Sequence, residues 1–400
     1  MENQRTYSRT HPWITFNLDL RRLDYKLWLM LGAAASKVEH ISGVPLMPQI
    51  ANELHTLYLA KGALATTAIE GNTLTESEAI AQIQGNLKLP PSRKYLQDEL
   101  QNIVDSCDAI QQQIFADGGG KLSINKIKSM NEGVLKNLEL PKEVEPGTFR
   151  RHEVVVGKYK CAPWQDCEYL MARYCEFLND FKFPDDDKYV FAIIKAIIAH
   201  IYFVWIHPFA DGNGRTARLI EYYILMLAGF PSPTCHLLSN HYNLTRNDYY
   251  KKLDLSSKEQ VGVFGFFNYA VRGLVDGLVE QINYIRGQQL YVFWINYIHE
   301  KLRGVSSDAE KRRRSVVLAL AARPHEPIKI DEIPKLSTSI GVQYASKTKK
   351  TVIRDLNTLQ NLDLVKVRDG KVIDRREIVI QYLPARLPVE EKDNLEITFS

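Results

Sequence analysis

Apolar residues recur three and four positions apart over most of the first 285 residues, which is the spacing of helices that bury one face. The first such stretch covers 20–110, and within it the run LYLAKGALATTAIEG stops at Gly71. Thr75, with Glu78 three positions later, predicts a capping box at the start of the next helix. The helical pattern returns over 169–285. The chain is therefore predicted to be mainly α-helical.

The most apolar stretch, residues 191–209, reads FAIIKAIIAHIYFVWIHPF. It has the length of a membrane span, but Lys195 and His200 interrupt it and Pro208 ends it. A charge at the centre of a bilayer is costly, whereas a helix that is apolar nearly all round also fits the centre of a large helical domain. We expect a buried central helix and no contact with a membrane.

Two short segments follow a β-rich pattern instead. Residues 147–163 contain EVVVGKYK, in which β-branched and aromatic residues surround Gly157, and this predicts a short hairpin. Residues 363–383 contain two β-rich runs on either side of Asp369-Gly370, which is a strong hairpin signal.

The second hairpin follows two predicted helices. The first covers 311–324 and begins with KRRR; the second covers 347–362 and places apolar side chains on one face, namely Val352, Ile353, Leu356 and Leu359. Two helices and a hairpin within some seventy residues predict a winged helix-turn-helix domain. We expect Arg375 and Arg376 to lie in its wing.

The pattern divides the chain into five parts. An N-terminal helical region covers 1–110, a helical core domain 111–285, a linker 286–310, a winged helix-turn-helix domain 311–385 and a tail 386–400.

Composition narrows the class of protein. The chain has 400 residues, 45% of them hydrophobic and 24% charged, which excludes a mainly disordered chain. The net charge of +4 gives no global signature of polyanion binding. Five cysteines without a CxxC pair indicate neither a disulfide framework nor a zinc site, and we expect a cytoplasmic location. The run DGGGK at 117–121 lacks the spacing of a P-loop.

The candidate chemistry lies in residues 207–218, HPFADGNGRTAR, just after the long apolar stretch. A glycine-rich turn that leads into a helix N-terminus is suited to bind an anion, because backbone N–H groups and the helix dipole both favour negative charge. Gly212 and Gly214 allow close approach of a ligand to the backbone. Arg215 and Arg218, three positions apart, can both contact phosphate oxygens from one turn of helix.

Two further side chains of this stretch complete a candidate nucleotide site. Asp211 is a hard oxygen ligand suited to Mg²⁺ shared with phosphates, and His207 can accept a proton near neutral pH. Taken singly, each feature also fits a loop histidine, an ordinary turn or a solvated pair of arginines. Within twelve residues the chain combines a base, a metal ligand, an anion site and two guanidinium groups. Together these features favour a site for nucleotide phosphates.

This stretch resembles the Fic family motif, HxFx(D/E)GNGRxxR, at every fixed position. The resemblance implies a helical core with a short hairpin flap and an enzyme that transfers AMP from ATP to a Tyr, Thr or Ser hydroxyl of a protein. It implies that His207 is the general base and that Asp211 holds Mg²⁺. It implies nucleotide binding by a larger set of residues, namely Gly212, Asn213, Gly214, Arg215, Thr216, Ala217, Arg218, Tyr249 and Tyr250.

A second resemblance lies upstream, where TTAIEG at 66–71 is similar to the family's (S/T)xxxE(G/N) inhibitory motif. The resemblance implies that Glu70 pairs with Arg218 and occupies the space that the γ-phosphate needs. A carboxylate on the guanidinium that should bind a phosphate competes with it directly. Without the Fic motif, a glutamate before glycine at a helix end would have no such meaning.

Two weaker resemblances leave alternatives open. The hairpin within 149–161 is similar to the family's flap, where a target segment docks by strand addition, but it also fits an ordinary surface hairpin. Tyr249 and Tyr250 resemble paired tyrosines that line the adenine pocket, but one packed in the core and one at the surface is an equal alternative.

The expected function is that of an autoinhibited protein adenylyltransferase using ATP and Mg²⁺. Its protein target is unidentified, and the chain itself is one candidate. One alternative is a DNA- or protein-binding regulator with the Fic core as a nucleotide sensor. Another is an enzyme that removes AMP, with Glu70 positioning water. Lys347, Lys349 and Lys350 at the start of the second C-terminal helix are compatible with DNA contacts. The sequence leaves the oligomeric state open.

Overall fold

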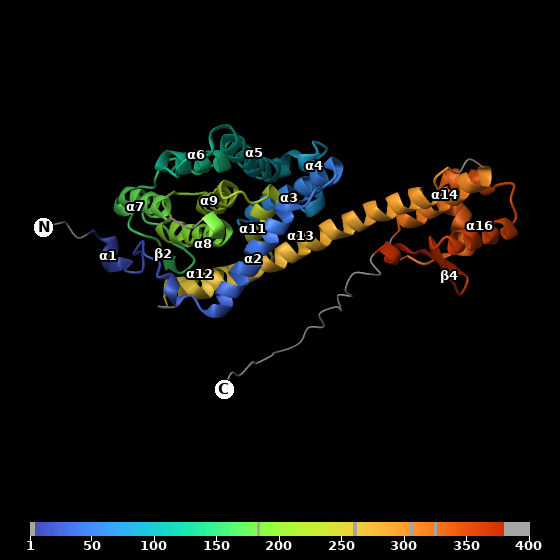
Figure 1. Ribbon diagram of the computed structural model, residues 1–400. Coiled ribbons are helices and arrows are strands. Elements are labelled where there is room, and N and C mark those ends of the chain that lie inside the picture. Colours follow the sequence, from blue (N-terminus) through green and yellow to red (C-terminus); the bar gives the residue numbers. More distant parts are fainter. Residues whose placement is uncertain (1–4, 182–184, 259–261, 305–306, 324–325, 380–400) are drawn as a thin grey trace. The chain divides into compact units, whose positions relative to one another are not determined.

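The computed structural model describes residues 5–181, 185–258, 262–304, 307–323 and 326–379 (Figure 1). They fall into two compact units, residues 1–282 and 283–400, and the division lies within helix α13, Gly262–Lys301. The predicted linker at 286–310 is thus helical as far as Lys301. The predicted tail, 386–400, lies outside the described residues.

The first unit is built almost entirely of helices. Before α13 these are α1 Tyr7–Thr10, α2 Tyr25–Gly43, α3 Pro48–Ala68, α4 Glu76–Ile83, α5 Lys94–Asp117, α6 Ile124–Leu135, α7 Cys167–Asp180, α8 Lys188–Ile206, α9 Asn213–Leu227, α10 Ser232–Cys235, α11 Leu237–Leu244 and α12 Arg246–Ser256. Its strands β1, Val155–Val156, and β2, Tyr159–Lys160, form an antiparallel hairpin, as predicted around Gly157. The predicted capping box of Thr75 and Glu78 is present at the start of α4.

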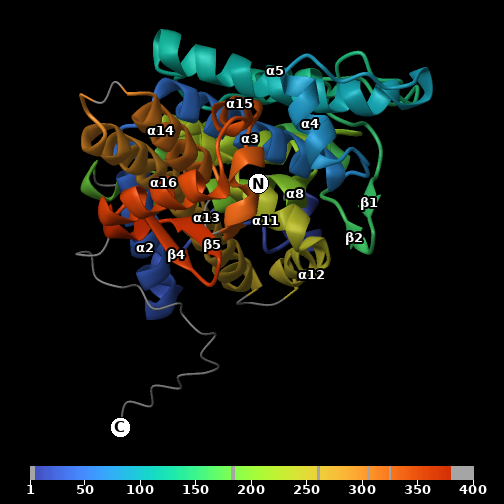
Figure 2. The ribbon, with the colours of Figure 1, turned by 90° about the vertical axis from the view of Figure 1, so that its right-hand side faces the viewer.

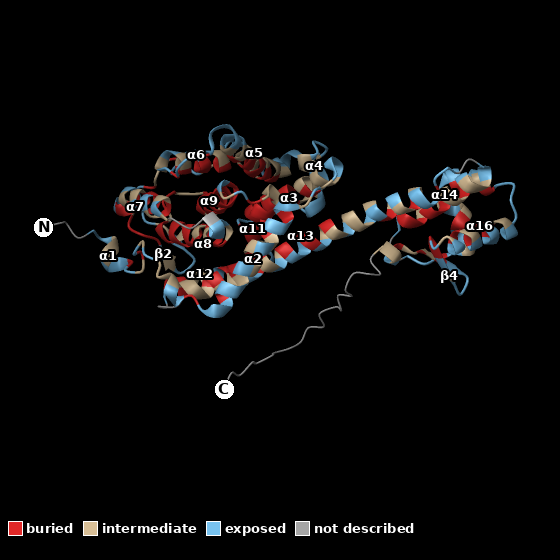
Figure 3. Ribbon diagram, in the orientation of Figure 1, coloured by how far each residue is buried: buried red, intermediate tan, exposed pale blue. Residues whose placement is uncertain are grey.

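Helices α8 and α9 form the centre of this unit. They pack against each other, α2 and α7 cover α8, and α3, α5 and α6 cover α9 (Figure 1). In Figure 2, α3 and α4 lie beside α5. Among the described residues, α8 is the helix long and apolar enough to cross a membrane, but 78% of its most apolar window is buried inside the unit (Figure 3). The predicted central helix is therefore buried, as expected for the core of a helical domain.

The second unit combines three helices with a small sheet. Beyond α13 it contains α14 Asp308–Ala321, α15 Thr338–Tyr344, α16 Lys349–Asn361 and the strands β3 Ile328–Lys329, β4 Val365–Arg368 and β5 Lys371–Asp374. The sheet is antiparallel with the order β3-β5-β4, and β4 and β5 form the predicted hairpin. Asp369 and Gly370 both have positive φ, 50° and 74°, as the two-residue turn requires.

The C-terminal core corrects two expectations. Val352, Leu356 and Leu359 are buried, but Ile353 is 39% exposed because it lies at the edge of the apolar face of α16. Arg376 is buried beyond the end of β5, where its Nε donates to Asp374 (2.7 Å) and its NH2 donates to the Ala321 carbonyl (2.7 Å).

Candidate active site

The long helix α8 ends at His207 in a left-handed conformation, with φ of 51°. This is uncommon for a residue other than glycine, and it turns the chain into the loop that leads to α9. Arg150 holds the turn in place, since its Nε donates to the His207 carbonyl (2.7 Å) and its backbone N–H donates to the Pro208 carbonyl (2.9 Å).

The imidazole of His207 is neutral near pH 7. Burial and the nearby positive charge of Arg150 lower its pKa to about 4, against the opposing effect of Glu70. A neutral imidazole can accept a proton, so His207 is in the ionisation state that a general base needs.

The loop between the two helices is closed by Asn213. Its Oδ1 accepts a hydrogen bond from the Phe209 N–H (3.0 Å), and its Nδ2 donates to the Phe209 carbonyl (2.8 Å). Phe209 points inward and is 1% exposed against Phe149 and Phe203. The side chain of Asn213 therefore shapes the loop, and its 2% exposure leaves little of it for a ligand.

Helix α9 starts directly after Gly212, which has φ of 77°. The first backbone N–H groups of a helix have no acceptor within it, so this end attracts anions. A Cβ on Gly212 would lie 2.8 Å from Asn131 Nδ2, and Asn131 also donates to the Asp211 carbonyl (3.0 Å). Thr216 and Ala217 are fully buried, so their side chains offer no surface to a ligand.

Two buried arginines project from the first turns of α9. Arg218 NH2 donates to the Thr66 carbonyl (2.9 Å) and to Glu70 Oε1 (2.6 Å). Arg215 NH2 donates to Asp211 Oδ1 (3.1 Å). The Nε and NH1 atoms of both arginines are buried and have no hydrogen-bond partner among the described residues. Such donors are costly to leave unpaired, which favours an anionic ligand at this place.

The predicted pairing of Glu70 with Arg218 is present in the structure. Burial alone would raise the pKa of Glu70, but the charge and hydrogen bond of Arg218, aided by Arg215, hold it below its ordinary value. The carboxylate is ionised at neutral pH, and 36% of the side chain surface is exposed. It lies at the end of α3, against the start of α9.

Asp211 lies at the mouth of the site with 43% of its side chain surface exposed. Its carboxylate accepts hydrogen bonds from Arg215 and from the Gly212 N–H. Within the described ranges, no three His, Cys, Asp or Glu side chains are grouped to hold a metal ion. A cation at Asp211 would therefore need oxygen atoms of a bound ligand, which suits a metal that arrives with phosphates.

The two tyrosines have different surroundings. Tyr249 is 2% exposed, and its hydroxyl lies 2.9 Å from Nε2 of the buried His200. Tyr250 is 42% exposed, and its hydroxyl donates to the Ile69 carbonyl (3.2 Å), next to Glu70. The structure therefore brings Tyr250 to the edge of the site and keeps Tyr249 in the core.

The sequence did not single out three residues that hold the site together. Arg150 fixes the turn at His207, Asn131 fixes the Asp211 carbonyl, and Glu99 Oε1 lies 3.8 Å from Arg215 NH1. All three come from segments distant in sequence, so no local pattern marks them. A cavity of about 560 Å³ beside Asp211 and Arg215, which Glu99 also lines, continues the site outward.

The chain is similar to known proteins over the part that contains this loop. Residues 109–225 match the Fic/DOC family model. The chain is 29% identical over 251 residues to protein adenylyltransferase fic-1 of Caenorhabditis briggsae, covering 62% of this chain and 45% of the relative. It is 30% identical over 201 residues to protein adenylyltransferase Fic of Drosophila yakuba, covering 50% and 37%. The chain thus spans less than half the length of these curated relatives.

Solved structures show the same fold. A Fic family protein from Desulfovibrio desulfuricans superposes with a TM-score of 0.52 at 18% identity, covering 88% of this chain and 96% of that one. Fic-1 of Caenorhabditis elegans superposes with a TM-score of 0.53 at 23% identity, covering 70% and 76%.

Proposed function

The chain is a Fic family protein, and we propose that it transfers AMP from ATP to a hydroxyl group of a protein. The observation that carries the proposal is the neutral imidazole of His207 beside a helix N-terminus that bears two partly unpaired arginines, Arg215 and Arg218. The names of the relatives, protein adenylyltransferases, support the same reaction.

The proposed reaction has one bond formed and one broken. The first N–H groups of α9, with Arg215 and Arg218, bind and orient the phosphates of ATP. His207 takes the proton of a Tyr, Thr or Ser hydroxyl as that oxygen attacks the α-phosphorus. The bond from the α-phosphorus to the bridging oxygen breaks, and pyrophosphate leaves. Most of the rate gain comes from positioning and charge stabilisation, as in other phosphoryl transfers.

The donor set fits a magnesium ion that enters with the nucleotide. Asp211 would supply one hard carboxylate oxygen, and phosphate oxygens and water would supply the others. When bound, Mg²⁺ would neutralise charge on the phosphates. Asp211 would then no longer accept the hydrogen bond from Arg215, and that guanidinium would be available for phosphate oxygens.

Glu70 gives the proposed enzyme an inhibited state. Its carboxylate uses the Arg218 NH2 group that a γ-phosphate would bind. Displacement of Glu70 would therefore switch the site to productive binding of ATP. The same carboxylate could position water for removal of AMP, and that reaction is the alternative outcome of the test below.

The test of the proposed function uses the Glu70→Gly chain. Incubated with Mg·ATP and a cell lysate, it should gain AMP on itself or modify a lysate protein, as measured by intact-mass spectrometry. The Glu70→Gly/His207→Ala chain is the control and should do neither. Loss of AMP from pre-modified proteins with the wild-type chain, which keeps Glu70, and no gain of AMP with either variant would favour the hydrolase instead.

The second unit carries a second candidate function. We propose that residues 311–385 form a winged helix-turn-helix that binds duplex DNA through α16. Residues 283–400 contain 21 Lys and Arg against 15 Asp and Glu, whereas residues 1–282 contain 30 against 32. The basic excess of the chain thus belongs to this unit.

The exposed face of α16 supports this proposal. Lys350, Arg354 and Asn357 follow one another at helical spacing and are all exposed. Asp355, the acidic residue of the helix, is buried, and its Oδ2 accepts hydrogen bonds from Arg312 Nε (2.7 Å) and the Tyr344 hydroxyl (3.0 Å). Helix α16 therefore exposes no acidic side chain beside Lys350, Arg354 and Asn357, which suits a helix in the major groove. Ile353 is a partly exposed apolar residue on the same side of the helix.

Other basic residues of the unit are already paired. Lys349 lies 2.6 Å from Asp331, and Arg375 forms an ion pair with Asp363.

The test is fluorescence anisotropy with a labelled duplex, in which the affinity of the chain for DNA should fall steeply with added salt. Lys350→Glu should weaken it, whereas Lys26→Glu, the same change on α2, should not. No binding at low salt would dismiss DNA and favour a protein partner.

A further inference from the structure

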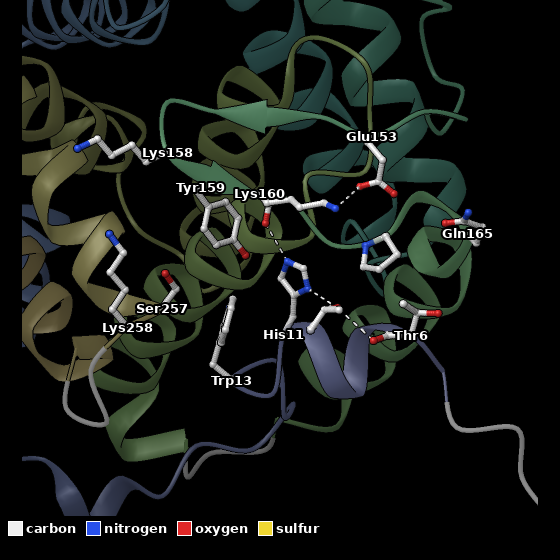
Figure 4. A pocket seen from close by; sticks show the side chains of 12 residues that line it. Thr6, His11, Trp13, Glu153, Lys158, Tyr159, Lys160, Gln165, Ser257 and Lys258 are labelled. Atoms are coloured by element: carbon white, nitrogen blue, oxygen red, sulfur yellow. Dashed lines mark hydrogen bonds and ion pairs between the residues drawn. The ribbon is translucent and has the colours of Figure 1, made fainter.

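A cleft of about 790 Å³ lies in the first unit, apart from the nucleotide site (Figure 4). Its walls come from three segments distant in sequence: the N-terminal segment 6–13, residues 153–165 with the hairpin of β1 and β2, and the chain just after α12. Of the motif residues 207–218, all within the described ranges, none lines this cleft. It is therefore a separate surface whose possible ligand the Fic motif does not account for.

One wall of the cleft is aromatic and fixed. The ring centroids of His11 and Trp13 lie 5.0 Å apart, and the Trp13 and Tyr159 rings lie 6.3 Å apart. His11 is 3% exposed, and both of its ring nitrogens have partners, the Thr10 hydroxyl (2.8 Å) and the Lys160 carbonyl (2.8 Å). Rings held in this way form a preformed contact surface for an apolar or aromatic side chain.

The other feature of the cleft is its positive charge. Three lysines and one glutamate line it. Lys160 lies 3.8 Å from Glu153, and Lys258 pairs with Asp254. Lys158 is exposed and has no ion-pair partner in the described part of the chain. Figure 4 places Lys158 and Lys258 together at one end of the cleft, next to Tyr159. Because Lys258 already pairs with Asp254, the uncompensated positive charge at this end is that of Lys158, and it attracts negative charge.

The hairpin connects the cleft to the reacting end of the site. The Tyr159 hydroxyl donates to the Trp205 carbonyl (3.1 Å), two residues before His207. At the base of the hairpin, Phe149 pairs with Phe209 in an isolated antiparallel bridge. A polypeptide held against the hairpin is therefore held against the same elements that position His207.

We propose that this cleft binds a segment of the protein substrate in which Asp or Glu side chains flank an aromatic or aliphatic one. The apolar side chain packs on Trp13 and Tyr159, and the carboxylates face Lys158 and Lys258. The inference rests on the proposed function, because it names the class of protein that supplies the hydroxyl. An acidic segment with an apolar anchor matches both the charge of the cleft and its aromatic wall. A basic segment does not match the charge, and a purely polar segment does not match the aromatic wall.

The test measures binding without any transfer. The probe is a fluorescein-labelled copolymer of Glu and Tyr, followed by anisotropy with the full-length wild-type chain at low salt. Lys158→Glu/Lys258→Glu should weaken binding at least about tenfold, which corresponds to about 1.4 kcal/mol. The matched control is Lys26→Glu/Lys251→Glu, which reverses two exposed lysines elsewhere and should change the affinity less than about twofold.

A second variant tests the aromatic wall. Trp13→Ala should abolish the preference of the chain for the Glu–Tyr copolymer over polyglutamate, while the affinity for polyglutamate changes little. An equal loss of affinity for the copolymer in the two double variants would overturn the proposal. Full displacement of the copolymer by inorganic phosphate would also overturn it, because the cleft would then be a simple anion site. Transfer by the Glu70→Gly chain is measured separately, so failure of the cleft and failure of the proposed reaction give different results.

Discussion

A Cβ on Gly214 would lie 2.2 Å from Glu70 Oε1, so the carboxylate of Glu70 rests directly on the first turn of α9. The same Cβ would lie 3.2 Å from the NH1 and NH2 atoms of Arg218. Only glycine leaves room at this position for an oxyanion between the backbone and the guanidinium. A phosphate that bound Arg218 as proposed would compete with this carboxylate for one place, which is the basis of the inhibition proposed above.

Glu70→Gly should increase AMP transfer at least about tenfold, because it removes the competitor from Arg218 without altering the phosphate contacts. The measurement is incorporation of AMP at saturating Mg·ATP. Glu76→Gly, the same change at an exposed position of α4, is the control and should leave transfer unchanged. Equal rates in the Glu70→Gly and wild-type chains would remove the inhibitory role.

His207→Ala should reduce transfer by roughly 10²–10⁴-fold and leave ATP affinity within a few-fold, because the imidazole acts on the acceptor proton and not on the phosphates. Calorimetric titration with ATP measures the affinity, and a transfer assay measures the rate of AMP transfer, both in the Glu70→Gly background. A large loss of ATP affinity would place His207 among the nucleotide contacts instead.

Asn213→Ala should destabilise the first unit by about 2–4 kcal/mol, because it leaves the N–H and the carbonyl of the buried Phe209 without partners. Urea denaturation followed by circular dichroism measures the free energy of unfolding. Asn240→Ala, in α11, is a control with one buried amide oxygen that has no partner in the described structure, and it should cost less. Transfer of AMP by the Asn213→Ala chain should also fall, because the loop between α8 and α9 loses the hydrogen bonds that hold its shape.

The first unit should begin to lose stability near pH 6.5, well above the pKa values of its buried histidines in the folded state. Burial lowers the pKa of His207 to about 4 and that of His236 to about 3, whereas unfolded histidines take up protons near pH 6.5. The unfolded state binds more protons in this window, so stability is full above pH 6.5 and falls as the pH drops toward 4. Each histidine contributes a slope of up to about 1.4 kcal/mol per pH unit.

The control for this pH dependence is His236→Phe. The ring stays beside Tyr222, whose centroid lies 4.9 Å away, but it no longer titrates. Unfolding free energies at pH 7, 6, 5 and about 4.5 should show a shallower slope for the variant than for the wild type. Parallel curves would mean that His236 does not carry this dependence.

Local signals in the sequence predicted the local structure around the candidate site. The motif at 207–218 is contiguous, so its turn and its helix start could be predicted from neighbouring residues. The capping box of Thr75 and the turn at Asp369 are equally local. One local signal was overlooked: Ser307 and Glu310 form a capping box, so α14 begins at Asp308, three residues before the predicted start.

What could not be predicted depends on packing between distant segments. Arg150 and Asn131 reach the loop from other elements, and nothing in their neighbouring sequence marks them. The burial of Tyr249 follows from its contact with His200 in the central helix. Arg376 is buried because Asp374 and the end of α14 both bind it, although its position after a hairpin suggested a basic wing.

The most direct test of the account follows the label of ATP in the Glu70→Gly chain. With ATP labelled on the α-phosphate, label should become covalently attached to protein, and His207→Ala in the same background should prevent this. With ATP labelled on the γ-phosphate, no label should be retained, because pyrophosphate leaves. Retention of the γ-label, or undiminished α-label without His207, would contradict the proposed transfer of AMP.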